Sequence, residues 1–158
     1  MALQLSVEEV RVLASLMEKS ITTPEYYPLS LNALVNACNQ KSCRDPVLAF
    51  DDAAVARALE LLREKQLVAS VAGADARVPK YKERLAELFA FDAPTRAVLA
   101  ELMLRGPQTV AELRSRSGRM HAWGGAADVQ RVLDEAAARP DGPWVVLLPR
   151  QPGRKEAR

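Results

Sequence analysis

The sequence has few of the residues that most enzyme and metal sites require. It contains one histidine and two cysteines, and it has neither a Ser-x-x-Lys motif nor a glycine-rich phosphate loop. Two thiols without further ligands make a poor zinc site. Cys38, at the end of a predicted helix, is expected to be a small core residue. We therefore expect a protein that is not an enzyme and has no metal or cofactor.

Disulfide frameworks, membrane spans and targeting signals are absent as well. Two cysteines form no disulfide framework, which indicates a reducing compartment, the cytoplasm. No stretch approaches the roughly 18 apolar residues that a membrane-spanning helix needs. The first ten residues have no basic start followed by an apolar segment, so we expect no signal peptide.

Aromatic residues are scarce, but hydrophobic residues as a whole are not. Aromatic residues make up 5% of the 158 residues, hydrophobic residues 49% and charged residues 27%. This balance is typical of a globular protein. With so few aromatic side chains, its core is built mainly from leucine, valine and alanine.

The first half of the chain has the pattern of three helices followed by a β-hairpin. A capping box at Ser6 and Glu9 opens a helix predicted at 7–20. Further helices are predicted at 31–38 and 53–65, and two extended segments separated by a turn follow them. Three helices and a hairpin in this order indicate a winged-helix domain.

The same pattern then starts again in the second half. Helices are predicted at 94–105, 110–117 and 126–138, and a capping box at Thr109 and Glu112 opens the second of them. A turn and the strand-like segment WVVLLP, rich in residues that favour strands, come after the last helix. Matching apolar positions recur in both halves, and the differences in length fall in the loops, where insertions are tolerated.

We predict a mainly α fold with small β-wings (α+β), made of two tandem winged-helix domains. The expected divisions are a first domain at 1–82, a helical connector at 83–91, a second domain at 92–150 and a basic tail at 151–158. Each half alone is close to the size at which a hydrophobic core becomes marginal, so we expect the halves to pack on each other. Whether the protein is a monomer or a homodimer stays open.

Several motifs, spread in order over most of the chain, resemble those of a known family. They are TTPEYYPLSLNALVNACNQKSCRDP, RVPKY, LRGPQTVAELRSRSGRMH and LPRQPGRKEAR. They are similar to the motifs of the YceH-like family of bacterial proteins. The resemblance implies a tandem winged-helix fold and supplies no activity. Relatives often continue past the last motif, so it also implies that a further segment can follow Arg158.

Basic residues gather in the second half. Residues 1–91 carry 11 Lys and Arg against 12 Asp and Glu, whereas residues 92–158 carry 11 against 8. Basic side chains bind nucleic-acid phosphates without regard to sequence. The expected nucleic-acid contacts are Arg114, Arg116, Arg119, Arg150, Arg154 and Lys155. The alternative is a solvated face that pairs with the excess acid of the first half.

Neither predicted third helix is a convincing reader of DNA bases. The helix at 53–65 follows Asp51 and Asp52, which a phosphate-lined groove would repel. The same two aspartates are explained without a ligand, because acids at a helix N-terminus cap it and complement its dipole. The helix at 126–138 carries acids beside its arginines.

Amides and tyrosines crowd the segment at 22–47. Asn32 and Asn36 share one helical face because they are four residues apart. The segment suits either a surface that binds a polar partner by hydrogen bonds or a buried network that fixes the long loop. The expected interaction-surface residues are Tyr26, Tyr27, Asn32, Asn36, Asn39, Gln40 and Lys41.

Two functions therefore remain open. The first is a regulator-like protein that contacts DNA phosphates through its second half. The second is a protein-interaction module that binds no nucleic acid and uses the amide-rich segment. The frequency of DNA binding among winged-helix proteins, together with the basic second half, narrowly favours the first, although fold alone does not establish function.

Overall fold

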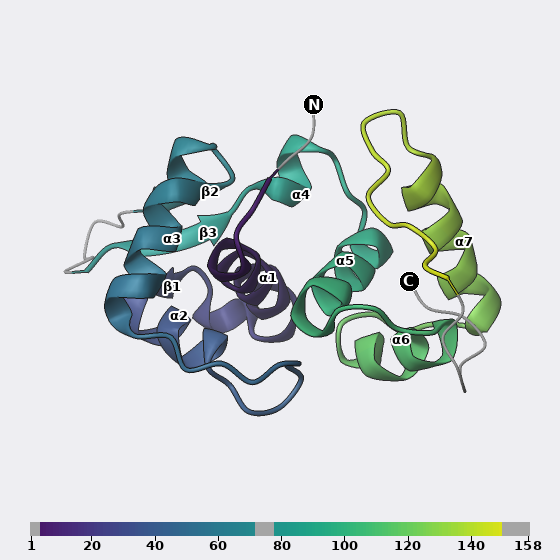
Figure 1. Ribbon diagram of the computed structural model, residues 1–158, viewed down its shortest axis with the longest axis horizontal. Helices are drawn as coiled ribbons and strands as arrows, with labels where there is room; N and C mark the ends of the chain where they lie inside the picture. Colours follow the sequence, from purple (N-terminus) through teal and green to yellow (C-terminus); the bar gives the residue numbers. More distant parts are fainter. Residues whose placement is uncertain (1–3, 72–77, 150–158) are drawn as a thin grey trace.

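Seven α-helices and one small antiparallel sheet make up residues 4–71 and 78–149, the part of the chain that the computed structural model describes (Figure 1). The elements of the first half are α1 (Val7–Thr22), β1 (Leu29–Ser30), α2 (Leu31–Cys38), α3 (Asp52–Glu64), β2 (Val68–Val71) and β3 (Lys80–Glu83). The short helix α4 (Leu85–Leu88) lies in the predicted connector, and the elements of the second half are α5 (Ala93–Arg105), α6 (Val110–Arg116) and α7 (Ala126–Ala138). Short 3-10 turns at Pro24–Tyr26 and Ser117–Arg119 complete the set. The prediction of a mixed fold with a small sheet is confirmed.

Five of the seven α-helices in the described residues begin at a capping side chain, whereas α4 and α7 have none. Ser6 and Thr109 each form a capping box with the glutamate three residues later. The side chains of Ser30, Asp51 and Asp92 each accept a hydrogen bond from a backbone N–H in the first turn. All six predicted long helices are confirmed, with ends that differ by at most two residues.

The sheet has the strand order β1-β3-β2, and all its pairs are antiparallel. β2 and β3 form a hairpin in which Val68 lies opposite Glu83. β1, directly before α2, pairs with β3 so that Leu29 lies opposite Tyr81. This pairing ties the start of α2 to the hairpin.

The strand predicted for the segment WVVLLP is wrong for the described residues. Residues 144–149 run without a strand, and only Leu148 takes part in an isolated bridge. In the first half β2 and β3 pair with each other, whereas the described residues of the second half contain no strand with which this segment could pair. Without a neighbouring strand, a β-forming sequence has nowhere to place its backbone hydrogen bonds.

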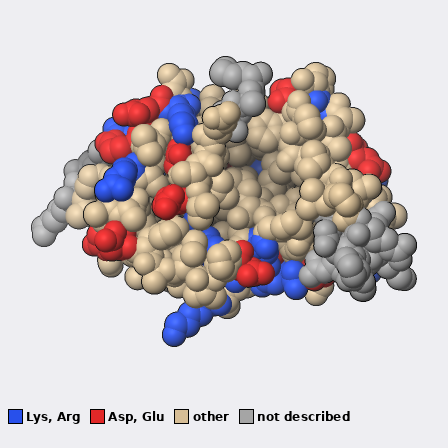
Figure 2. Space-filling model, in the orientation of Figure 1, with Lys and Arg blue, Asp and Glu red and all other residues tan. Residues whose placement is uncertain are grey.

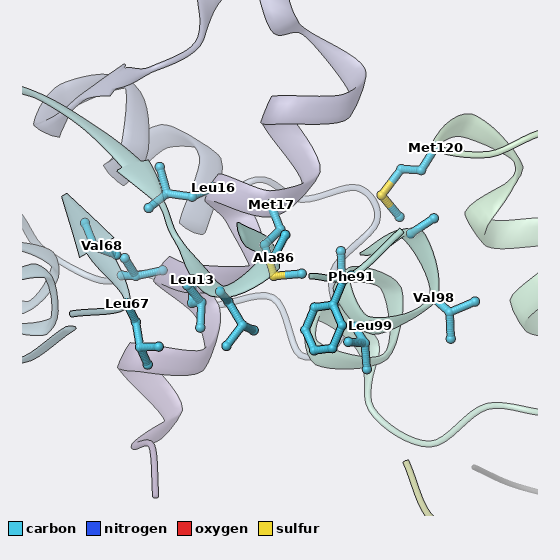
Figure 3. Packing of buried hydrophobic residues seen from close by; sticks show 14 of the residues in the cluster. Leu13, Leu16, Met17, Leu67, Val68, Ala86, Phe91, Val98, Leu99 and Met120 are labelled. Carbon is cyan, nitrogen blue, oxygen red and sulfur yellow. The ribbon is translucent and has the colours of Figure 1, made fainter. Parts of the chain in front are cut away.

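α1 is the central helix of the molecule. It packs against α2, α3, α5 and β3, and every residue from 11 to 18 is buried. Figure 1 shows α1 and α5 between α3 on one side and α7 on the other. One hydrophobic cluster runs through both halves, and Figure 3 shows its labelled side chains extending from Leu67 past Met17 to Leu99. The two halves therefore share a single core.

No helix within residues 4–71 and 78–149 has both the length and the hydropathy required to cross a bilayer.

Candidate interaction surfaces

Arg119, one of the expected phosphate contacts, lies at the junction of the two halves. Its Nη2 binds a carboxylate oxygen of Glu18 on α1 at 2.7 Å, and its Nη1 binds Glu101 on α5 at 2.7 Å. Glu18 is 1% exposed and Glu101 is 0% exposed. Burial alone lowers the pKa of the Arg119 guanidinium, but its hydrogen bonds to Glu101 and Glu18 outweigh burial and raise the pKa. Arg119 thus neutralises two carboxylates that water cannot reach.

Glu18 has a second partner in Arg44, from the loop between α2 and α3. The Arg44 guanidinium donates to both carboxylate oxygens, at 2.7 and 3.1 Å, and its side chain has no exposed surface. Arg44 Nε also donates to the carbonyl of Ala37 at 3.2 Å. Burial raises the pKa of Glu18, but the bonds from Arg44 and Arg119 outweigh it and lower the pKa to about 2. We call Glu18, Arg44, Glu101 and Arg119 the junction cluster.

The other expected phosphate contacts are divided among different surroundings. Arg116 pairs with Glu112 at 3.2 Å and donates to the side-chain oxygen of Gln108 at 3.3 Å. Arg114 is exposed and has no ion pair within the described ranges. Arg150, Arg154 and Lys155 lie outside the described residues. Of Arg114, Arg116 and Arg119, Arg114 is therefore the one whose charge remains available to a binding partner.

The amide-rich segment contains four exposed candidates. Tyr26 is 73% exposed in the turn before β1. Asn32 and Asn36 lie on the outer face of α2, and Lys41 follows that helix; all three are exposed. Their side chains make no hydrogen bond to another described residue. These four residues, Tyr26, Asn32, Asn36 and Lys41, form what we call the α2 surface.

The other three members of that segment hold the fold together. Asn39 exchanges two hydrogen bonds with the backbone of Phe50, both at 2.8 Å, and thereby closes the loop before α3. Gln40 accepts a hydrogen bond from Lys19 at 2.9 Å. The hydroxyl of Tyr27 accepts a hydrogen bond from the backbone N–H of Glu83 at 2.7 Å, and burial raises its pKa above the ordinary value. Three residues of this segment therefore belong to a structural hydrogen-bond network, and the four exposed ones remain candidates for an interaction surface.

The two cysteines form no disulfide, and Cys38 differs from Cys43 in how deeply it is buried. Cys38 is fully buried, as predicted, and burial raises the pKa of its thiol to about 11. Cys43 is half-buried, and neither cysteine takes part in a disulfide. Across the part of the chain that the structure describes, His, Cys, Asp and Glu side chains form no group of three that could hold a metal ion.

The junction cluster was not recognised from the sequence, although a local signal exists. Glu18 is four residues from the buried Ala14, and Glu101 is four residues from the buried Ala97. Both acids therefore lie on the apolar face of their helices. A charged residue at a core position is rarely buried unless it is paired, so each predicts a basic partner from elsewhere in the chain.

Comparison with known proteins relates the chain to one family. The model described as "Protein of unknown function, DUF480" matches residues 5–154. The chain is 58% identical over 158 residues to a UPF0502 protein of Geotalea daltonii, which covers all of this chain and 72% of the relative. It is 59% identical over 150 residues to a UPF0502 protein of Citrifermentans bemidjiense, covering 95% of this chain and 69% of the relative. A UPF0502 protein of Opitutus terrae is 54% identical over 154 residues, with 98% of this chain and 67% of the relative covered.

Proposed function

The chain belongs to the DUF480 family of UPF0502 proteins, and we propose that it is a non-enzymatic protein-interaction module that docks its partner on the α2 surface. The main support is the pair Asn32 and Asn36, whose exposed amides have no partner among the described residues. A side-chain amide both donates and accepts, so it can pair with the backbone or with polar side chains of another protein. Tyr26 adds an exposed aromatic ring of the kind enriched at interfaces.

The scaffold beneath this surface favours docking without rearrangement. On its inner side α2 packs against α1 and α3, with Leu34 and Cys38 fully buried. β1 fixes its start, and the Asn39–Phe50 bonds fix its end. A surface that is already held in place loses little conformational entropy on binding. More of the free energy of its polar contacts therefore contributes to affinity.

Charge argues against the alternative of a DNA-contacting protein. α3 begins beside Asp51 and Asp52, and α7 exposes Asp134 and Glu135. A groove lined with phosphates repels such helix faces. On the face drawn in Figure 2, acidic and basic side chains are interspersed over the first half, and the basic side chains that gather along the lower middle edge have acidic ones among them. Arg119, moreover, already binds two carboxylates.

We further propose that each half is a winged-helix unit. The first half supports this with three helices, a β-hairpin and a short strand before the second helix. The second half repeats the three helices as α5, α6 and α7 and has no sheet within the described residues. We place the protein in the cytoplasm, with support from its two unpaired thiols.

Site-specific photo-crosslinking in living cells tests the α2 surface. A photoreactive amino acid is placed at Tyr26, with a second version of the protein carrying it at Glu135, an exposed position on α7. We expect a discrete protein adduct from Tyr26 and none of that size from Glu135. The adduct should disappear in the double variant Asn32→Ala/Asn36→Ala, because both hydrogen-bonding amides are then removed.

A parallel titration with DNA decides between the two functions. Fluorescence anisotropy of a labelled mixed-sequence duplex is followed at about 50 and about 200 mM salt, a range over which phosphate contacts weaken strongly. We expect no binding at either concentration. Salt-sensitive binding that is lost in Arg114→Ala, together with adducts unaffected by the asparagine changes, would replace the interaction module with a DNA-associated protein.

A further inference from the structure

A polar pocket of about 320 Å³ lies where the first half passes into the second. It is lined by Lys82, Glu83, Ala86, Glu87, Phe91 and Arg96. These residues come from β3, α4, the segment between α4 and α5, and the first turn of α5, which follow one another along the chain, with α4 near the top of Figure 1. The volume is at the lower end of the range of pockets that hold small molecules, and such pockets favour the boundaries between structural units.

The protein balances the positive side of the pocket only partly: the charge of Arg96 acts on Glu83 and that of Lys82 acts on Glu87, without a direct ion pair among the described residues. Arg96 donates from Nη2 to the hydroxyl of Ser20 at 2.9 Å, and its buried Nε has no hydrogen-bond partner. Within the described residues neither Arg96 nor Lys82 has a carboxylate at ion-pair distance. A buried guanidinium N–H without a partner is costly, so an acceptor supplied by a ligand would be favoured there.

On the negative side of the pocket, the Glu83 carboxylate also has few partners. Glu83 is half-buried, and one of its carboxylate oxygens accepts a hydrogen bond from the backbone N–H of Ala86 at 3.1 Å. It has no ion pair in the described part of the chain, burial raises its pKa, and the nearby charge of Arg96 opposes that rise. Glu87, by contrast, is already paired with Arg84 at 2.8 Å. The groups left for a ligand are therefore two cations and one carboxylate.

We propose that this pocket binds a small molecule that carries both a carboxylate and an ammonium group, such as a free α-amino acid. Arg96 and Lys82 provide the positive charge for the ligand carboxylate, and Glu83 provides the negative charge for its ammonium group. The ring of Phe91 supplies an apolar wall beside them. A ligand with only one of the two charges would leave part of the pocket unpaired, which lowers its affinity.

Titration of the ¹⁵N-labelled full chain with L-glutamate, followed by NMR, tests the pocket. We expect saturable shift changes centred on the backbone amides of residues 82–96, with a Kd on the order of 1 mM. Arg96→Gln and Glu83→Gln should each weaken binding about tenfold, the loss expected for one charge-assisted hydrogen bond. Glu60→Gln, in an exposed ion pair on α3, is the matched control and should leave the Kd unchanged.

The same titration with glutarate, which lacks the ammonium group, is made on the unaltered protein. We expect its Kd to be at least about tenfold weaker than that of glutamate, because Glu83 then has no partner. Equal affinity for the two compounds would overturn the proposal even if a variant fails to fold. Absence of saturable shifts with glutamate, or unchanged binding in both pocket variants, would also overturn it.

Discussion

At the scale of single residues, the junction cluster shows how strongly burial constrains charge. Glu18 is almost inaccessible, yet its two arginine partners keep it ionised. An unpaired carboxylate at such a position would cost several kcal/mol, whereas a bidentate arginine restores most of the lost hydration. The cluster therefore stabilises the fold only while both signs of charge are present.

Acid should remove the stabilising contribution of Glu18. Its pKa is lowered from 4.5 when unfolded to about 2 in the folded protein. A carboxyl group with a lowered folded pKa contributes stability above its unfolded pKa, and that contribution is lost as the pH falls through the folded pKa. We expect its share of the free energy of unfolding, about 3 kcal/mol, to disappear between roughly pH 5 and pH 2.

Urea unfolding across this pH range, for the unaltered protein and for Glu18→Gln, measures the effect. The variant should be less stable at neutral pH, because Arg44 and Arg119 lose a charged partner. Its free energy of unfolding should also fall less steeply on acidification. Parallel pH profiles would show that Glu18 is not the group responsible.

At the scale of secondary-structure elements, the important contact is the one between α1 and α5. The apolar cluster covers most of this contact, and the junction cluster closes one part of it. Arg119 comes from the turn after α6, so a third element connects the two helices. The long loop joins in as well, because the backbone N–H of Asp45 donates to the carbonyl of Leu104 at 3.1 Å.

Arg119→Ala should destabilise the protein by about 2–4 kcal/mol, because it leaves two buried carboxylates facing each other with less compensation. Arg114→Ala, five residues earlier at an exposed position of α6, should change the stability by no more than about 0.5 kcal/mol. Chemical denaturation of the two variants gives both values. Equal effects would mean that the junction cluster contributes no more than an ordinary surface charge.

The same elements show what could be predicted from the sequence. Helices were predictable because their caps and apolar periods are local, as at Ser6 and Thr109. The strand at 144–149 was not, because a strand depends on a partner that the periodic pattern does not reveal. The Arg119–Glu18 pair joins residues 101 positions apart, so a local pattern can indicate that Glu18 needs a basic partner but cannot identify that partner. The division of the amide-rich segment depends in the same way on distant contacts such as Tyr27 to Glu83.

At the scale of the whole molecule, the shared core predicts that the halves unfold together. Both tryptophans, Trp123 and Trp144, lie in the second half, whereas the helices are distributed over both halves. Tryptophan fluorescence thus reports on the second half, and far-ultraviolet circular dichroism reports on the whole chain. We expect the two unfolding curves in urea to coincide, as two-state behaviour requires.

Met17→Ala sharpens this test, because Met17 is a fully buried core residue of α1, in the first half. The substitution should lower stability by about 2–5 kcal/mol and shift both curves equally. Two separate unfolding midpoints, or a fluorescence transition that Met17→Ala does not shift, would show that the halves are thermodynamically independent.

The lack of contacts at Asn32 and Asn36 also has an evolutionary consequence. Exposed side chains that make no hydrogen bond in the free protein can be exchanged with little effect on folding, so selection at these positions acts on what they meet outside. Changes on this face of α2 can therefore alter what the protein binds without disturbing the buried charges of the junction cluster. The same freedom makes this face the natural place to graft a new binding specificity onto this scaffold.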